Sequence, residues 1–194
     1  MSARLSAPAR REQLLQVALT VFAEKGFHAT SMNDIADAAG VTKPVLYQHF
    51  DSKRELYLAL LDECGARLVE ALSKATSEAT DGKSQTENGF RAYFRFAHDE
   101  VDSFRLLFGS GARRDEEFAA AVRKILASTA EAIAPLIAAD IELKHQRTVA
   151  HALTGLAEGV TRYLQSTGED FDPDVIARQV ADLAWAGLRG VHRP

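Results

Sequence analysis

The chain has 194 residues, of which 46% are hydrophobic and 26% are charged, and its formal net charge is −4. This size and composition fit a globular protein of one or two domains. The single cysteine, Cys64, excludes an intramolecular disulfide, and no uncharged run approaches the ~18 residues of a membrane span, so we expect a cytoplasmic protein without a membrane partner.

The first part of the chain predicts a flexible tail at residues 1–9 and a helix over about residues 9–25. Apolar residues recur along this helix at the spacing of one helical face. They are Leu14, Leu15, Ala18, Val21 and Phe22. Gly26 is expected to end the helix, since glycine accepts the left-handed backbone of many helix ends.

A short helix is predicted next, over about residues 32–39. Ser31 can cap it while the Asp34 carboxylate reaches back, which is the arrangement of a capping box. Gly40 should stop it with a sharp corner. Ala36, four residues earlier, is small enough to let a following helix approach closely, so the pattern favours a helix-turn-helix.

The second helix of this motif is predicted over about residues 43–50. Thr42 is suited to precede it, and Pro44 stands in its first turn, where no amide donor is lost. Leu46 should hold the helix to the core. The outer face offers a cation, a methyl surface, a phenol, an amide and an imidazole, the groups that meet phosphates and base edges in a DNA major groove. These side chains belong to Lys43, Val45, Tyr47, Gln48 and His49.

Residues 22–56 resemble the DNA-binding head of the TetR (tetracycline-repressor-like) family. The segments that carry the resemblance are Lys25-Gly26-Phe27, Thr30-Ser31, Asp34-Ile35-Ala36, Ala39-Gly40-Val41, Leu46-Tyr47, His49-Phe50 and Ser52-Lys53. The resemblance implies an all-α homodimer that binds a palindromic operator, usually as a repressor, and releases it when a small molecule enters the C-terminal domain. It also implies a set of DNA-binding residues: Ser31, Met32, Asn33, Thr42, Lys43, Pro44, Val45, Tyr47, His49 and Lys53.

The resemblance also implies individual roles for these side chains. Lys53 is expected to hold a phosphate, and so is the Tyr47 hydroxyl. Lys43 either reads guanine acceptors or contacts a phosphate. Residues 1–60 carry seven Lys and Arg against six Asp and Glu, so attraction to DNA must come from the placement of a few cations.

A long helix over about residues 53–77 should join this head to the rest of the chain. Ser52 and Glu55 form a further capping pattern at its start. We therefore predict a DNA-binding domain at residues 10–52 and a ligand-binding and dimerisation domain at residues 53–194, with about nine helices in all.

The middle of the chain is rich in aromatic residues, which favours either a filled core or a cavity for an apolar ligand. A break is expected at Gly109-Ser110-Gly111, and Pro135 should kink or end a later helix. The candidate ligand-binding residues are Phe90, Tyr93, Phe94, Phe96, Phe104, Phe108, Phe118 and Val122.

The last two helices carry small residues at regular spacing, which suggests close approach of another helix, because glycine costs up to ~1 kcal/mol in a helix interior. Pairing across a two-fold axis would give a homodimer, and tight packing within one chain is the alternative. The candidate interface residues are Ala152, Gly155, Gly159, Ala181, Ala184 and Leu188.

No pattern of an enzyme is present in the sequence. The six histidines show no metal-ligand spacing, and we find no paired cysteines and no glycine-rich phosphate loop, so we expect no metal or cofactor. The leading hypothesis is a ligand-responsive DNA-binding regulator. The alternatives are a DNA-bound adaptor that recruits or blocks a partner protein, and, far behind, a helical enzyme with a decayed head.

Overall fold

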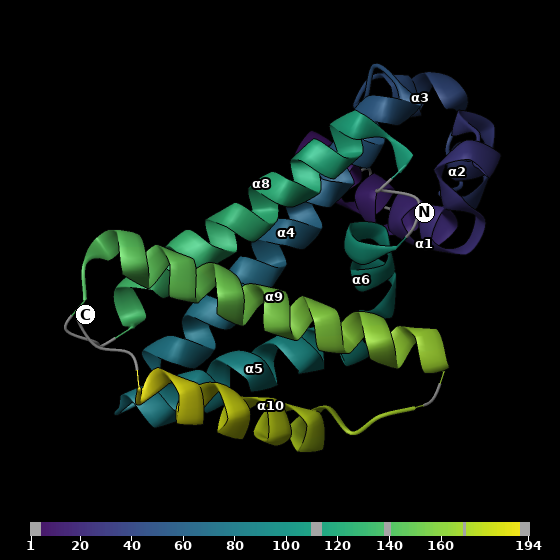
Figure 1. Ribbon diagram of the computed structural model, residues 1–194. Coiled ribbons are helices and arrows are strands. Elements are labelled where there is room, and N and C mark those ends of the chain that lie inside the picture. The colour runs from purple at the N-terminus through teal and green to yellow at the C-terminus, as the bar shows by residue number, and fades with distance from the viewer. Residues whose placement is uncertain (1–4, 110–113, 138–140, 169, 191–194) are drawn as a thin grey trace. The chain divides into compact units, whose positions relative to one another are not determined.

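The computed structural model describes residues 5–109, 114–137, 141–168 and 170–190. Within these ranges the chain is all-helical, as predicted, with nine α-helices, one 3-10 turn and no strand (Figure 1). In chain order they are α1 (Ala7–Ala29), α2 (Met32–Ala38), α3 (Lys43–Tyr47), α4 (Lys53–Ser77), α5 (Gly82–Asp99), α6 (Val101–Phe108), α8 (Glu116–Ile133), η1 (Ala134–Leu136), α9 (Leu143–Thr167) and α10 (Pro173–Leu188).

By packing, the chain divides into two compact units. The first comprises residues 1–64 and 102–122, and the second comprises residues 65–101 and 123–194. The helices α4 and α8 each contribute to both units. These units group the chain differently from the division at residue 52, which stays a prediction about where the DNA-binding and ligand-binding domains meet.

The first unit has a core of fully buried side chains from α1, α2, α3 and α4 and from the segment between α3 and α4. They include Leu14, Ile35, Leu46, Phe50 and Leu56, each at most 1% exposed. The predicted end of the first helix at Gly26 is present as a kink, with φ 77° and ψ 166°, and one further helical turn continues to Ala29. The third helix ends at Tyr47, earlier than predicted, because Gln48, His49 and Phe50 close tight turns onto carbonyls of the preceding residues.

The second unit places α10 alongside α5, with α9 packed on both (Figure 1). Small residues allow the close approach of α10 and α5: a Cβ atom added at Gly82 would lie 3.2 Å from the Trp185 ring. Ion pairs from Arg91 and Arg95 to Asp174 join the same two helices.

Two predicted interruptions of the helices have different outcomes. Pro135 ends α8 as expected, since the chain passes there into the short turn η1. The predicted break at Gly109-Ser110-Gly111 lies mostly outside the described residues. No helix in the described ranges is long and apolar enough to cross a membrane.

Candidate DNA-recognition surface and effector cavity

The start of α2 is fixed by the capping box that the sequence predicts. The backbone amide of Asp34 donates to the Ser31 hydroxyl at 3.1 Å, and the amide of Ser31 donates to the Asp34 carboxylate at 2.8 Å. The Ser31 hydroxyl also donates to that carboxylate, and Lys25 forms an ion pair with it. These bonds, that of Ser31 first, hold the pKa of Asp34 well below its usual range, so the cap stays charged.

The corner between α2 and α3 depends on Gly40. Its φ of +62° lies in the left-handed region, where glycine is favoured over residues that carry a Cβ atom. The amide of Val41 then donates to the Ala36 carbonyl at 3.0 Å and closes the turn. Leu46, fully buried, holds α3 against the core. The two helices therefore form the helix-turn-helix that the sequence predicts.

The outer face of α3 presents most of the predicted DNA-contacting side chains to solvent. Thr42, Lys43 and Pro44 are exposed, and Tyr47 is 42% exposed. The Lys43 ammonium lies 5.9 Å from the centre of the Tyr47 ring. A cation and a phenol thus stand side by side on this face, which suits phosphate oxygens and base acceptors.

Three other predicted residues are less accessible. Val45 and His49 are half-buried, and Met32 is only 6% exposed. Met32 therefore does not stand at the surface as predicted: its side chain shares the buried face of α2 with Ile35 and Ala36, and this face turns away from Ser31 and Asn33. Both of these neighbours are exposed.

Lys53, predicted to hold a phosphate, is tied into the protein. Its ammonium donates to the carbonyls of Phe27 and Thr30 at 2.8 and 2.7 Å and lies 4.4 Å from the centre of the Phe27 ring. Two of its three donors are thus used to hold the α1–α2 connection to the start of α4. The phosphate contact stays a prediction, and it would have to use the third donor.

The sequence did not reveal the contact of Arg54 with the start of α8. The guanidinium donates to both carboxylate oxygens of Asp115 at 2.7 Å, binds Glu117, and lies 4.7 Å from the centre of the Phe118 ring. Phe118, predicted to bind a ligand, packs here against Phe27 and Tyr57. Arg54 and Asp115 are 61 positions apart in the sequence, so no local sequence pattern could predict their contact.

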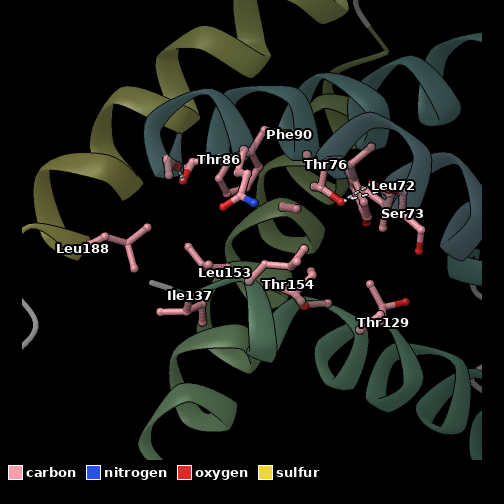
Figure 2. A pocket seen from close by; sticks show the side chains of 18 of the residues that line it. Leu72, Ser73, Thr76, Thr86, Phe90, Thr129, Ile137, Leu153, Thr154 and Leu188 are labelled. Carbon is pink, nitrogen blue, oxygen red and sulfur yellow. Dashed lines mark hydrogen bonds between the residues drawn. The ribbon is translucent and has the colours of Figure 1, made fainter. Parts of the chain in front are cut away.

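A cavity of about 720 Å³ lies within the second unit (Figure 2). Its walls come from α4, α5, α8, η1, α9 and α10 and are largely apolar. The lining residues are Val69, Leu72, Ser73, Thr76, Ser77, Gly82, Gln85, Thr86, Gly89, Phe90, Tyr93, Thr129, Ala132, Ile133, Leu136, Ile137, Leu153, Thr154, Ala157, Trp185, Leu188 and Arg189. Its volume and its apolar character are typical of a small-molecule site.

Two of the eight predicted ligand-binding residues, Phe90 and Tyr93, line this cavity. The other six do not. Phe94, Phe104 and Phe118 are at most 1% exposed and fill cores. The number of aromatic residues in a segment does not determine which of them face a cavity. The remaining three, Phe96, Phe108 and Val122, also lie away from the cavity wall. What the sequence reasoning missed are the threonines and small aliphatic residues of α4, α8 and α9.

The predicted dimer-interface residues fall into two groups. Ala152, Gly155 and Gly159 are exposed on α9, and a Cβ atom at either glycine would meet nothing within 4 Å. Ala181 and Ala184, by contrast, are 5% and 8% exposed, because they let α10 pack inside the chain, which was the alternative reading. Leu188 lines the cavity. Large exposed apolar side chains also stand on these helices, with Tyr163 and Leu183 each 65% exposed.

Comparison with known proteins agrees with this geometry. Residues 14–60, which span the helix-turn-helix, match the family model described as bacterial regulatory proteins, tetR family. Over 190 residues the chain is 35% identical to the HTH-type transcriptional activator FasR of Mycolicibacterium smegmatis, covering 97% of this chain and 87% of FasR. The chain belongs to the TetR family.

Two further proteins are similar to this TetR-family chain over different lengths of the sequence. The HTH-type transcriptional repressor KstR2 of Rhodococcus jostii is 44% identical over 79 residues, which are 36% of this chain and 39% of KstR2. The crystal structure of a TetR-like transcriptional regulator from Rhodococcus sp. RHA1 is 30% identical, covers 97% of this chain and 100% of that one, and has a TM-score of 0.78. The chain is thus a DNA-binding transcriptional regulator and not an enzyme.

Proposed function

We propose that this TetR-family protein is a homodimeric repressor, which binds a palindromic operator and is released from it by a small apolar effector. The observation that carries the proposal is the pairing of an exposed α3 surface with a separate apolar cavity in the same chain. A ligand that prefers a conformation misfitting the operator lowers DNA affinity by its differential binding, typically by 1–3 kcal/mol of coupling.

The α3 surface supports the DNA-binding half of the proposal. Lys43 and Tyr47 lie together on the exposed face, while Leu46 between them is fully buried. In the proposed complex Tyr47 donates to a phosphate and Lys43 reads guanine acceptors. Thr42, Pro44, Val45 and His49 complete the contact.

Mutants of these two residues separate phosphate contact from base reading. Tyr47→Ala should weaken binding to all operator variants by a similar factor. Lys43→Ala should in addition relax the preference at one base pair, which is worth about 1–3 kcal/mol of discrimination. Equal losses on every operator variant for Lys43→Ala would contradict its base-reading role.

The dimer is supported by the exposed face of α9. Gly155 and Gly159 leave open space where another helix can approach, and Ala152 lies one turn before Gly155. The operator is palindromic in the proposal because two identical heads related by a two-fold axis read two equal half-sites. Sedimentation of the protein with and without Gly155→Leu tests this face, since a bulky side chain there should favour the monomer.

The decisive experiment measures fluorescence anisotropy on DNA from upstream of the gene against scrambled DNA at two salt concentrations. Two protomers per site and a dissociation constant of about 10⁻⁸–10⁻¹¹ M are expected. Deleting the gene should then raise transcription from that promoter. A fall in transcription would instead make the protein an activator, the role for which FasR is named.

A DNA-bound adaptor is the second candidate function. It requires that the body recruit or block a partner protein and that no small molecule alter operator binding. The open cavity of about 720 Å³ argues against it, since an adaptor has no need of an unfilled core. Stabilisation of the protein by apolar ligands, measured by thermal unfolding, distinguishes the two.

A further inference from the structure

The cavity wall carries threonines from four different helices. Thr76 belongs to α4, Thr86 to α5, Thr129 to α8 and Thr154 to α9. Each hydroxyl donates its hydrogen to the carbonyl four residues earlier in its own helix, at 2.8 to 3.0 Å. The accepting carbonyls belong to Leu72, Gly82, Ile125 and Ala150.

This shared pattern decides what the hydroxyls can offer a ligand. A threonine hydroxyl has one hydrogen to donate and two lone pairs that can accept. The hydrogen is already used, so the oxygen retains acceptor capacity and no donor. The threonines therefore suit a ligand that donates a hydrogen bond, and they disfavour a carboxylate or phosphate, whose lone pairs would face theirs.

The hydroxyls gather toward one end of the cavity. Figure 2 shows Ser73, Thr76 and Thr129 on the side opposite Leu188, with Thr154 nearer the middle, and we call these four residues the hydroxyl end. Thr76 and Thr129 are 8% and 2% exposed, so water has little access to them. Each threonine hydroxyl already donates within its helix, so the lone pairs that remain on these buried oxygens can accept a hydrogen bond from a ligand.

The other end is apolar and leads to the single charged side chain among the described lining residues. Ile137 and Leu153 belong to an apolar cluster, and Leu188 and Trp185 also line the cavity. Thr86 lies near this end, one turn from Gly82, where an added Cβ atom would lie 3.2 Å from the Trp185 ring. Arg189 is exposed at the end of α10, where an anionic group would be favoured.

We propose that the effector is an apolar molecule bearing a neutral hydroxyl group, which donates a hydrogen bond to the threonine oxygens of the hydroxyl end. This inference rests on the proposed function, because it takes the cavity to be the effector site. A chain with an anionic group at Arg189 and a hydroxyl at its far end matches both ends of the cavity.

Decanoate and 10-hydroxydecanoate test the proposal, because they differ only in the terminal hydroxyl. Trp185 is the chain's single tryptophan and lines the cavity, so its fluorescence reports binding. We expect 10-hydroxydecanoate to bind about two- to tenfold more tightly than decanoate, the gain that one net hydrogen bond provides. In a cavity without a matching acceptor, the desolvated hydroxyl would instead weaken binding.

Variants of the hydroxyl end give the sharper result. Thr129→Val combined with Thr154→Val should weaken 10-hydroxydecanoate binding about tenfold or more and leave decanoate binding within about twofold. Thr129→Ser combined with Thr154→Ser should keep the preference. Thr86→Val is the matched control, since it removes a lining hydroxyl with the same bonding near the opposite end, and it should not change the preference.

Each outcome is informative. Decanoate binding with weaker binding of 10-hydroxydecanoate, unaffected by the valine variants, would overturn the hydroxyl proposal and leave the effector cavity intact. No response of Trp185 to either ligand would overturn both. Retained decanoate binding in the valine variants shows that they are folded.

Discussion

The two packing units of this protein differ in how their interiors are filled. In the first, Phe22, Phe27, Tyr57 and Phe118 form a continuous set of ring contacts, with centroids 4.5 to 6.1 Å apart. In the second, six helical segments surround a cavity of about 720 Å³. The first interior favours one rigid arrangement, which a DNA-reading surface needs, whereas the second leaves room for a guest molecule.

Burial in this filled core changes the pKa of one of its side chains. Tyr57 lies among the rings at 3% exposure, and burial raises the pKa of its hydroxyl to about 12. The rings thus exclude water from the base of the DNA-binding head. In the second unit, the hydroxyls of the cavity wall are satisfied by their own helices, so the wall stays stable without a ligand.

The largest expected effect comes from emptying part of the filled unit. Leu46→Ala removes a fully buried side chain that holds α3 and should cost about 2–5 kcal/mol of unfolding free energy. Hydrogen exchange should rise first in α2 and α3, and operator binding should be lost. Tyr47→Ala is the control at the adjacent, exposed position. Equal destabilisation by both variants would contradict the assignment of Leu46 to the core.

A smaller effect is expected from overfilling the second unit. A Cβ atom at Gly65 would lie 2.7 Å from the Ile125 side chain, so Gly65→Ala should cost about 1–3 kcal/mol. Ile125→Ala removes the clashing atoms. A double-mutant cycle by chemical denaturation should therefore show that Gly65→Ala costs far less in the Ile125→Ala background. Additive losses would mean that α4 and α8 separate freely at this point.

The contrast between the units also explains what the sequence could predict. The capping box of Ser31 and Asp34, the corner at Gly40 and the buried Leu46 all depend on residues within a few positions of one another, and the structure confirms them. The predicted box at the start of α4 is only half formed: the Glu55 amide donates to the Ser52 hydroxyl, but the Glu55 carboxylate accepts from the amide of Asp51. The cavity could not be predicted from a local sequence pattern. Its wall includes Thr76, Thr129 and Thr154 from three different helices, and in the sequence each of them looks like an ordinary helical residue. The aromatic residues of the middle helices were a plausible signal, but most of them fill cores instead.

A third prediction separates the two possible roles of Lys53, which are to hold the α1–α2 connection and to contact a phosphate of the DNA. Lys53→Met removes two hydrogen bonds to the carbonyls of Phe27 and Thr30 and should destabilise the first unit by about 1–2 kcal/mol. If Lys53 acts only within the protein, the salt dependence of operator binding should not change. Loss of a phosphate contact would lower the slope of log K against log salt by about 0.9. Titration of operator DNA at four salt concentrations, with Tyr47→Ala as a comparison, measures that slope.

The smallest expected effect concerns the capping box of α2 and its dependence on pH. The Ser31 hydroxyl and Lys25 lower the pKa of Asp34, so the folded protein binds this proton less readily than the unfolded chain does. The stabilisation is therefore fully present above the unfolded pKa of about 3.9 and is lost as the pH falls through the lower folded value.

Asp34→Asn should reduce the melting temperature by a constant amount between about pH 5 and 7. This difference should shrink below about pH 4, as the wild-type carboxylate takes up its proton. Because the site is exposed, the change should be small, and Asp37→Asn, one turn later and outside the box, should show no such convergence. A difference that persists at low pH would mean that the charge of Asp34 does not stabilise the helix start.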